Sequence, residues 1–192
     1  GQLLLVVVAV MGKGVSAAFL SGMIRTALRL NVSQDSTLNT LMHQLNLTLC
    51  MLLGDLTFFA TACLAKVDRD LQFVDVVNAG HCPCLVFRDA RVVRQIEPSG
   101  PPIGLYESQQ YEVERVDLEP GMALLMVTDG VYEWETRPGE LWGWDAFVEF
   151  ARERSDQSAE TFWEALQQER LHSGSEAGLE DDQTLLSWRR NV

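Results

Sequence analysis

The sequence predicts an α+β fold in which layered β-sheets carry helices packed on their outside. An apolar, β-branched run near the start is followed by two segments whose apolar residues have helical spacing. The middle of the chain has the pattern of successive hairpins, and helical spacing returns before a final strand. Because hairpins and amphipathic helices each bury one apolar face, this combination favours sheets covered by helices. With no internal repeat, low-complexity tract or clear linker, we expect a single domain over residues 1–192.

The first part of the chain predicts one buried strand and two helices. Residues 3–10 are a continuous run of Leu, Val and Ala, which is typical of a central strand. Apolar residues then recur at positions i, i+3, i+4 and i+7, which predicts amphipathic helices over 14–31 and 36–53. Between them, Ser33 to Ser36 supplies residues suited to helix capping.

The centre of the chain predicts strands separated by short turns, such as those at Asp68-Arg69-Asp70 and Asp89-Ala90. The expected strands cover residues 57–67, 71–78, 85–88, 91–96, 111–118 and 123–128. Helical spacing then predicts two further helices, the second with Ser158 as its N-cap. These helices are expected over 144–154 and 159–171, and a last strand over 183–189.

Composition excludes several classes of protein. The chain has 27 Asp and Glu against 15 Lys and Arg, a net charge of −12. It therefore lacks the basic stripe that displaces counterions from nucleic acid, and we expect no nucleic-acid partner. No apolar run reaches the ~18 residues that a membrane span requires, so we expect no membrane span. An acidic surface is usual for a soluble bacterial cytosolic protein, and we expect a cytoplasmic location.

The cysteines and the first residues give two further expectations. Cys50, Cys63, Cys82 and Cys84 lack the paired spacing of a zinc site, so we expect reduced structural thiols. Gly1-Gln2 leads straight into the apolar strand without a signal peptide or a helix cap. We therefore expect that the sequence begins inside a larger protein.

Carboxylates stand at two turns beside apolar strands. Asp129 ends a strand of Leu, Met and Val, and Gly130 lets the chain turn at once. Asp181 and Asp182 precede the last strand, where alternation directs one carboxylate toward the rim of the sheet. Asp129 could instead cap its own turn, and the Asp pair could belong to a solvated acidic loop. Together the two turns favour oxygen ligands for Mg²⁺ or Mn²⁺ rather than for zinc.

Other catalytic patterns are weaker. Gly12-Lys13-Gly14 is not a P-loop, because Val7 stands where the first glycine is needed and Gly14 where Ser or Thr is needed. The start of the following helix could still attract an anion. His81 lies in a turn between strands and is either part of a site or a structural hydrogen-bonding residue.

Two remaining features also leave alternatives open. No G-x-S-x-G motif is present, which argues against a serine nucleophile of that kind. Trp134, Trp142 and Trp144 follow the Asp129 turn and form either a partner-binding wall or a satellite of the core.

Motifs in a fixed order give the chain a family resemblance. They are Val10-Met11-Gly12-Lys13-Gly14 with Ala17-Ala18, Asn78-Ala79-Gly80-His81, Gly104-Leu105, Leu118-x-Pro120-Gly121 with Thr128-Asp129-Gly130-Val131-x-Glu133, and Asp181-Asp182-x-Thr184. In this order and spacing, the chain resembles the SpoIIE-like (RsbU-type) branch of the metal-dependent PPM serine/threonine protein phosphatases. The matches cover almost the whole sequence.

The resemblance implies a fold, a metal centre and a ligand set. The fold is a four-layer α-β-β-α sandwich, with two mainly antiparallel sheets flanked by helices. A centre of two Mn²⁺ or Mg²⁺ ions activates a bridging water for in-line attack on phosphoserine or phosphothreonine, without a protein nucleophile. The implied ligands are Asp129, Asp181 and the main-chain carbonyl of Val10, with Asp182 as a neighbouring candidate. The residues expected around the metals and the phosphate are Gly12, Lys13, Gly14, Gly130 and His81.

The chain departs from the family pattern at the metal site. Ala9 occupies the position of the aspartate that bridges both metals in the family, and its methyl group offers no oxygen. An upstream G-G-D-x-x-D-like segment with a further acid is absent from this sequence, and Met122 stands where the family often has Asp. Ala9 is explained by an engineered Asp→Ala change, a natural pseudophosphatase or a rearranged metal set.

The function implied by the resemblance is dephosphorylation of a signalling protein. Within this branch the substrate is a phosphorylated anti-sigma-factor antagonist of the STAS type, in partner-switching control of bacterial stress or developmental transcription. Such domains usually follow a sensor or receiver domain, and the helices over 14–31 and 36–53 are expected contacts for regulation or homodimer formation. The alternatives are a catalytically inactive phosphoprotein-binding module and a structural domain that uses its Trp-rich face.

Overall fold

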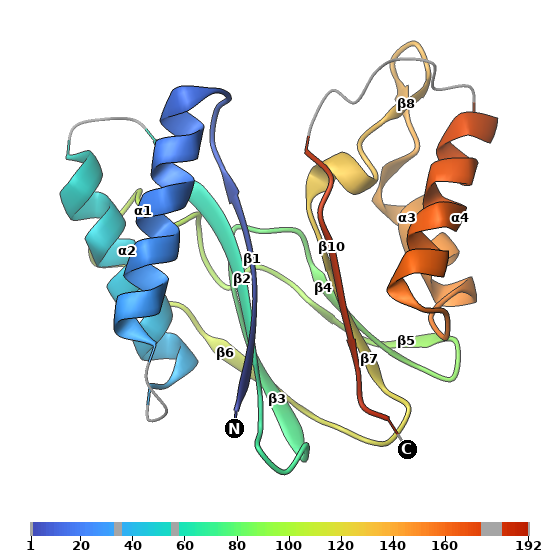
Figure 1. Ribbon diagram of the computed structural model, residues 1–192, viewed down its shortest axis with the longest axis horizontal. Helices are drawn as coiled ribbons and strands as arrows, with labels where there is room; N and C mark the ends of the chain where they lie inside the picture. Colours follow the sequence, from blue (N-terminus) through green and yellow to red (C-terminus); the bar gives the residue numbers. More distant parts are fainter. Residues whose placement is uncertain (1, 33–35, 55–57, 174–181, 192) are drawn as a thin grey trace. The chain divides into compact units, whose positions relative to one another are not determined.

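The computed structural model describes residues 2–32, 36–54, 58–173 and 182–191. The chain divides into two compact units, the first formed by residues 1–83 and 96–118 and the second by residues 84–95 and 119–192. Figure 1 labels the elements of both units along the chain. No helix in the described ranges is long and apolar enough to cross a membrane.

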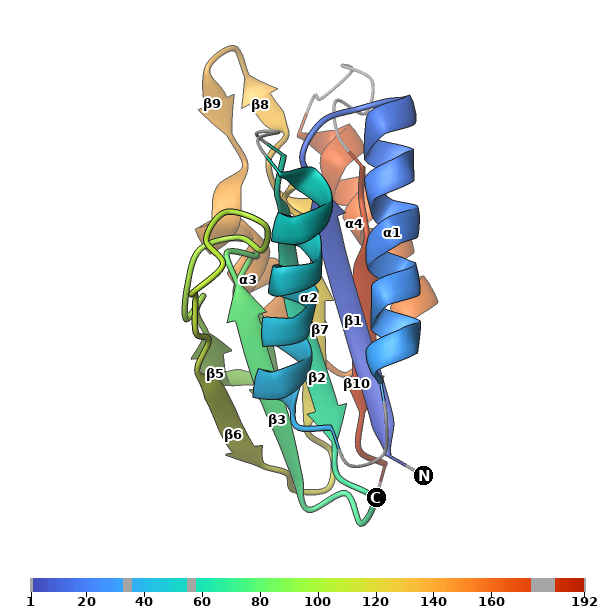
Figure 2. The same cartoon turned by 90° about the vertical axis from the view of Figure 1, so that its left-hand side faces the viewer.

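The first unit is built on a four-stranded sheet with the order β1-β2-β3-β6. Its strands are β1 (Leu3–Val10), β2 (Ala60–Val67), β3 (Phe73–Ala79) and β6 (Val113–Asp117), and each neighbouring pair is antiparallel. Strand β1 lies at one edge of this sheet, so the prediction of a central strand for residues 3–10 is wrong. The continuous apolar run indicated full burial, whereas only Val7 of this strand is buried. Helices α1 (Val15–Asn31) and α2 (Leu38–Leu53) cover one face of it (Figure 2).

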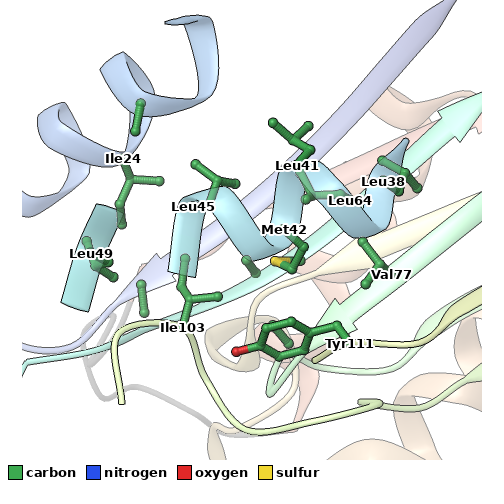
Figure 3. Packing of buried hydrophobic residues seen from close by; sticks show 14 of the residues in the cluster. Ile24, Leu38, Leu41, Met42, Leu45, Leu49, Leu64, Val77, Ile103 and Tyr111 are labelled. Carbon is green, nitrogen blue, oxygen red and sulfur yellow. The ribbon is translucent and has the colours of Figure 1, made fainter. Parts of the chain in front are cut away.

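The core of the first unit lies between α2 and the sheet. Met42, Leu45 and Leu49 are almost fully buried on α2, and they pack in one cluster with residues of the strands and of the loop before β6 (Figure 3). Burying an aliphatic side chain of this size contributes about 1.5–3 kcal/mol, so α2 is anchored mainly by this apolar face. Tyr111 closes the cluster from the loop side and is 1% exposed.

The second unit is also built on a four-stranded sheet, with the order β10-β7-β4-β5. Its strands are β4 (Cys84–Arg88), β5 (Arg91–Ile96), β7 (Ala123–Val127) and β10 (Leu185–Arg189), and β7 pairs antiparallel with both β4 and β10. Helices α3 (Gly143–Glu153) and α4 (Ala159–His172) pack with this sheet in one apolar cluster. A short 3-10 turn, η1 (Asp129–Val131), and a hairpin of β8 (Glu135–Arg137) and β9 (Glu140–Leu141) link β7 to α3.

Aromatic rings fill the core of the second unit. Trp134 stacks on Trp142 with ring centroids 4.3 Å apart, and Tyr132 meets Trp144 edge-on at 5.1 Å. Trp134 is buried, and Trp142 and Trp144 pack against the same cluster. These tryptophans therefore belong to the core of the second unit, as one of the two sequence interpretations held.

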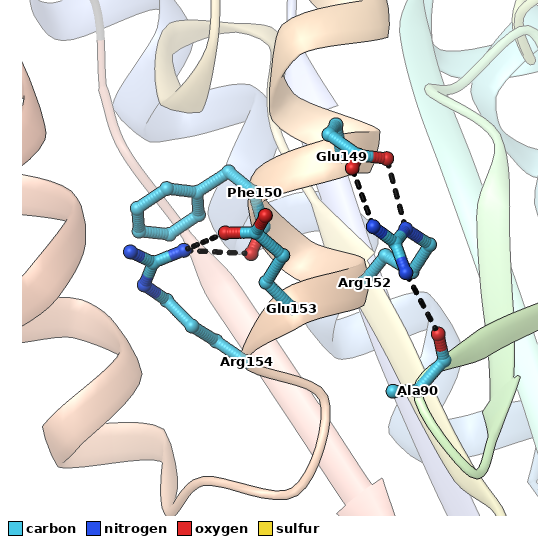
Figure 4. Close-up of polar contacts among 6 residues, drawn as sticks. All are labelled: Ala90, Glu149, Phe150, Arg152, Glu153 and Arg154. Atoms are coloured by element: carbon cyan, nitrogen blue, oxygen red, sulfur yellow. Dashed lines mark hydrogen bonds and ion pairs between the residues drawn. The ribbon is translucent and has the colours of Figure 1, made fainter.

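Polar contacts at the end of α3 connect it to its surroundings (Figure 4). Arg152 forms a two-point ion pair with Glu149 on the same helix and also reaches the carbonyl oxygen of Ala90 at 3.5 Å. Arg154 lies over the ring of Phe150, 4.0 Å from its centroid. Exposed ion pairs of this kind contribute about 0–1 kcal/mol each, so packing rather than charge holds α3 in place.

The structure confirms the predicted α+β class and the sequence order of the predicted elements. Differences are concentrated at element ends. Helix α2 starts at Leu38 because Thr37 is its N-cap, accepting a hydrogen bond from the Thr40 amide, while the expected capping residues 33–35 lie outside the described ranges. The last strand starts at Leu185 rather than at residue 183, and β6 is shorter than 111–118 because Tyr111 turns into the core. The β8–β9 hairpin was not predicted.

The cysteines are free thiols, as expected for reduced structural residues. Cys63 and Cys84 are buried on strands, and Cys50 is half-buried on α2. Burial, with the nearby negative charge of Glu107, raises the pKa of the Cys50 thiol. A raised pKa keeps this sulfur protonated and unreactive at neutral pH.

Candidate active site

In the first unit, Ala9 lies directly opposite Thr61 across the antiparallel pair of β1 and β2. Val8 and Val10 pack on the core beneath the helices, as do Ala60 and Ala62 on β2. Because side chains alternate along a strand, Ala9 and Thr61 point together to the opposite face of the sheet. The position that the family resemblance assigns to a carboxylate is therefore neighboured by a hydroxyl.

The turn after β3 is held by side-chain hydrogen bonds. Thr61 Oγ1 lies 2.7 Å from Nδ1 of His81. The His81 amide donates to Oδ1 of Asn78 at 2.9 Å, and Nδ2 of Asn78 donates to the carbonyl of Cys82 at 3.0 Å. His81 and Asn78 are 4% and 1% exposed, so these bonds are shielded from water. The hydrogen-bonding role of His81 is thus observed, and a role in a site is compatible with it.

Gly80 makes this turn possible. Its φ is +63°, a region that L side chains rarely adopt, and an added Cβ would lie 2.5 Å from Cδ of Pro102. Any larger residue would clash with the Pro102 ring and displace His81. The motif Asn78-Ala79-Gly80-His81 is therefore a tightly packed turn that holds the His81 imidazole beside Thr61.

The carbonyl of Val10 faces the open edge of β1. The Met11 amide donates to the carbonyl of Phe59 at 3.0 Å, so residue 11 is a hydrogen-bonded position of the β1–β2 ladder. In an antiparallel pair such positions alternate with positions whose N–H and C=O point away. Ala60, the partner of Val10, accordingly exchanges both of its backbone bonds with Ile103 instead. The main-chain oxygen proposed as a ligand is thus not used by β2.

The turn between β1 and α1 presents backbone amides. Gly12 and Gly14 have φ of +94° and +76°, and Gly14 is the N-cap of α1 without a side-chain cap. The first turn of α1 contains no acidic residue, and Lys13 is exposed just before it. A helix N-terminus with these features favours an anion such as a phosphate.

In the second unit, Asp129 opens the 3-10 turn after β7. Its Oδ1 accepts a hydrogen bond from the amide of Gly130 at 3.0 Å, and its own carbonyl accepts from the amides of Tyr132 and Glu133. The carboxylate is half-buried. Asp129 therefore caps its own turn through one carboxylate oxygen. The carboxylate can still accept further hydrogen bonds or coordinate a cation.

Thr128 joins the two acidic turns of the second unit. Its hydroxyl donates to the carbonyl of Asp182 at 3.0 Å and accepts from the amide of Thr184 at 2.9 Å. The Thr128 amide donates to the carbonyl of Thr184 at 3.1 Å, and Gln183 Nε2 donates to the carbonyl of Gly130 at 2.7 Å. These bonds extend the β7–β10 register beyond both strands, so the segment of Asp182 runs beside Asp129.

The structure places the predicted site residues in two groups. Ala9, Val10, Gly12, Lys13, Gly14 and His81 lie in the first unit, and Asp129, Gly130 and Asp182 lie in the second. Asp181 lies outside the described residues. Within the described ranges, no group of three or more His, Cys, Asp or Glu side chains is arranged to hold a metal ion.

The available donors fit a hard divalent cation only in part. Carboxylates of Asp129 and Asp182 and the carbonyl of Val10 are oxygen donors of the kind that Mg²⁺ and Mn²⁺ prefer. In the first unit, the methyl group of Ala9 offers no oxygen donor beside the carbonyl of Val10.

Thr128 and Asn78 lie within the sequence motifs without a predicted role, and Thr61 lies outside every motif. The motif spacing could have singled out Thr128 and Asn78, since each stands next to a predicted site residue. Thr61 carries no such signal, because only the register of β1 against β2 brings it opposite Ala9.

The fold and these turns define the class of protein. The chain has two largely antiparallel sheets with two helices each. Solved PP2C (PPM-type) serine/threonine phosphatase domains have the same architecture. A family model described as Stage II sporulation protein E (SpoIIE) matches residues 1–191, and the chain belongs to the SpoIIE family.

Individual relatives agree with this assignment. Phosphoserine phosphatase RsbP of Bacillus subtilis is 26% identical over 132 residues, which cover 67% of this chain and 33% of RsbP. The SiaA-PP2C domain of Pseudomonas aeruginosa has a TM-score of 0.83 at 24% identity, covering 97% of this chain and 75% of that one. The RsbU and RsbW domains of Rv1364c from Mycobacterium tuberculosis have a TM-score of 0.76 at 30% identity. The match covers 99% of this chain and 52% of that one. The aligned part of this chain thus spans a third of the length of RsbP.

A more distant structure with this fold was determined with metal. The catalytic domain of the serine/threonine protein phosphatase PstP, in complex with 2 manganese ions, has a TM-score of 0.67 at 12% identity. The match covers 96% of this chain and 85% of the PstP chain.

Proposed function

We propose that this chain is the catalytic domain of a metal-dependent serine/threonine protein phosphatase, weakened by Ala9. Its proposed substrate is a phosphorylated anti-sigma-factor antagonist of the STAS type, dephosphorylated in the cytoplasm under an upstream regulatory domain. The observation that carries the proposal is the Thr128 hydroxyl, which holds the Asp182–Thr184 segment beside Asp129. Membership of the SpoIIE family and the likeness to RsbP and SiaA support it.

The proposed ligands of Mn²⁺ or Mg²⁺ are Asp129, Asp181 and the carbonyl of Val10, with Asp182 as a neighbour. When bound, such ions supply an activated water and neutralise charge on the phosphoryl group. The distant relative PstP, described with 2 manganese ions, supports a two-metal centre. The chain itself orients the phosphate through the N-terminus of α1 and Lys13, which favour an anion at the turn before α1.

Ala9 is the proposed cause of impairment. A carboxylate at this position is a ligand in the family, and loss of even an outer-shell partner costs about 10–100-fold in metal affinity. Loss of a direct bridging ligand should cost about 100-fold or more by the same reasoning. The ordered contact of Thr61 with His81 beside position 9 supports an engineered change or a natural pseudophosphatase over a rearranged metal set.

Hydrolysis of p-nitrophenyl phosphate with Mn²⁺ tests the assignment. We expect weak turnover by the unchanged chain and at least a ~100-fold gain in Ala9→Asp, with Ala9→Asn as the isosteric, uncharged control. The active variant should then release phosphate from a phosphorylated STAS protein faster than from an unrelated phosphothreonine peptide. Strong hydrolysis by the unchanged chain would contradict the role of position 9.

Ala9 also favours one alternative, a pseudophosphatase that binds its phosphoprotein without turnover. This alternative predicts that neither the unchanged chain nor Ala9→Asp hydrolyses p-nitrophenyl phosphate. It further predicts that the unchanged chain retains the phosphorylated STAS protein over its unphosphorylated form in a binding assay. We also propose that the chain forms a homodimer through the helices α1 and α2, and sedimentation in the same buffer should then give twice the mass of one chain.

A further inference from the structure

Thr61 is a residue of β2 that carries a hydroxyl group. It lies directly opposite Ala9 on the same face of the sheet, and it is only partly buried. Directly opposed side chains in an antiparallel pair have their Cβ atoms about 4.5–5.5 Å apart. A carboxylate at position 9 would therefore bring an oxygen within hydrogen-bonding reach of Thr61 Oγ1.

The partner of Thr61 on the other side is fixed. His81 is held by the Asn78 side chain through its amide, and Gly80 allows the close approach of Pro102 that closes the turn. The imidazole is 4% exposed, with Nδ1 at 2.7 Å from the Thr61 hydroxyl. Because the turn and the burial restrict the ring, its Nδ1 determines how Thr61 can use its single proton.

The hydrogen-bonding capacity of a hydroxyl gives this arrangement a direction. Threonine has one donor and can accept two bonds, and a neutral imidazole donates from one nitrogen only. If His81 donates from Nδ1 to Thr61, the hydroxyl proton is available for a third group. The adjacent site on that face of β1 is position 9.

We propose that Thr61 and His81 are positioning residues for the side chain at position 9, with Thr61 as hydrogen-bond donor to a carboxylate there and His81 as the residue that orients Thr61. The proposal rests on the proposed function, because it assumes that position 9 carries a metal ligand in the active form. It assigns to both residues the part of outer-shell partners, which orient a ligand without touching the metal. In the unchanged chain the pair is retained although the ligand is missing.

Mn²⁺ affinity, measured by calorimetry, tests the pair in two backgrounds. In Ala9→Asp, adding Thr61→Val should weaken binding about 10–100-fold, and adding Thr61→Ser, which keeps the hydroxyl, should change it little. In the unchanged chain, Thr61→Val should leave any Mn²⁺ binding unaltered. Thr26→Val, on the exposed side of α1, is the matched control. Equal loss in both backgrounds, or none in Ala9→Asp, would overturn the proposal.

A second measurement needs neither metal nor activity. In metal-free Ala9→Asp with ¹⁵N-labelled histidine, nuclear magnetic resonance should show a proton on Nδ1 of His81, assigned by comparison with His81→Gln. An unprotonated Nδ1 in this variant would mean that Thr61 donates to His81 rather than to residue 9, and the proposal would fail. If Ala9→Asp binds no Mn²⁺ but shows the protonated Nδ1, the positioning pair stands and the metal assignment of the proposed function falls.

Discussion

Two threonines at strand ends of the two units are used in different ways. Thr128 bonds its hydroxyl to two backbone partners, the carbonyl of Asp182 and the amide of Thr184. Thr61 instead shares its hydroxyl with a side chain, the imidazole of His81. Thr128 thereby holds the segment from Asp182 to Thr184, whereas Thr61 is oriented by the imidazole of His81.

The difference indicates how the candidate residues of each unit tolerate substitution. In the second unit the Thr128 hydroxyl and the Gln183 side chain bond to main-chain groups, and the Asp129 carboxylate accepts one bond from the Gly130 amide. In the first unit the neighbourhood of position 9 depends on a chain of side chains, Thr61, His81 and Asn78. Loss of the carboxylate at position 9 is compatible with an intact fold, because none of these bonds involves Ala9.

The largest effect is expected at Asp129. In the Ala9→Asp background, Asp129→Asn should lower Mn²⁺-dependent hydrolysis of p-nitrophenyl phosphate by about 100-fold or more, because it removes a direct anionic ligand where outer-shell losses already cost about 10–100-fold. Asp156→Asn, an exposed aspartate between α3 and α4, is the control and should have no effect. Activity near that of Ala9→Asp would remove Asp129 from the ligand set.

Replacement of Thr128 should mainly lower stability. Thr128→Val leaves the Asp182 carbonyl and the Thr184 amide without their partner, at a cost of about 1–3 kcal/mol for a buried polar group. We expect about 3 kcal/mol less free energy of unfolding in urea, with a faster-exchanging amide at Thr184. Thr136→Val, whose hydroxyl bond to Glu140 is exposed, should cost less than about 0.5 kcal/mol. Equal losses would show that the link between the acidic turns carries little energy.

A smaller loss is expected at the turn after β3. Asn78→Ala removes the acceptor for the His81 amide and the donor to Cys82, so about 2 kcal/mol of unfolding free energy should be lost. In Ala9→Asp it should also weaken Mn²⁺ binding, since His81 would no longer be held beside Thr61. A stability loss without any change in Mn²⁺ binding would separate the turn from the site.

The smallest effect, and one of opposite sign, is expected at Tyr111. Its buried hydroxyl has no hydrogen-bond partner among the described residues, so Tyr111→Phe should be neutral or stabilising by about 1 kcal/mol at pH 7. Burial raises the pKa of Tyr111 to about 12, from an ordinary value near 10. The folded state thus favours the neutral phenol, and this contribution is complete below pH 10 and declines between pH 10 and 12. Urea midpoints across that range should fall less steeply in Tyr111→Phe than in the parent.

Sequence patterns predicted the fold well because its elements are strongly periodic. The helical spacing on α1 and α2 buries one apolar face of each helix, which fixes their type. The continuous apolar run at residues 3–10 indicated a strand but not its place at the edge of the sheet. The β8–β9 hairpin escaped prediction because its strands are two and three residues long and exposed on most positions. Such short strands depend on their neighbours rather than on their own pattern.

The candidate site was predictable where it is local in sequence. Asp129 with Gly130, and Asp182 before the last strand, mark their turns by residue type alone. The family resemblance added Val10, whose proposed role as a ligand rests on its main-chain oxygen and so cannot be predicted from residue type. Thr61 could not be found, since its proximity to Ala9 and His81 is set by strand register over long sequence separations.

The outward-facing carbonyl of Val10 has a consequence for how this site can be lost and regained. Every amino acid carries that oxygen, so no substitution at residue 10 deletes it while β1 keeps its ladder with β2. Residue 9 has no such safeguard, because its contribution resides wholly in a side chain. Under the proposed function, Ala9→Asp would therefore add a side-chain ligand to a strand end that already presents its main-chain oxygen.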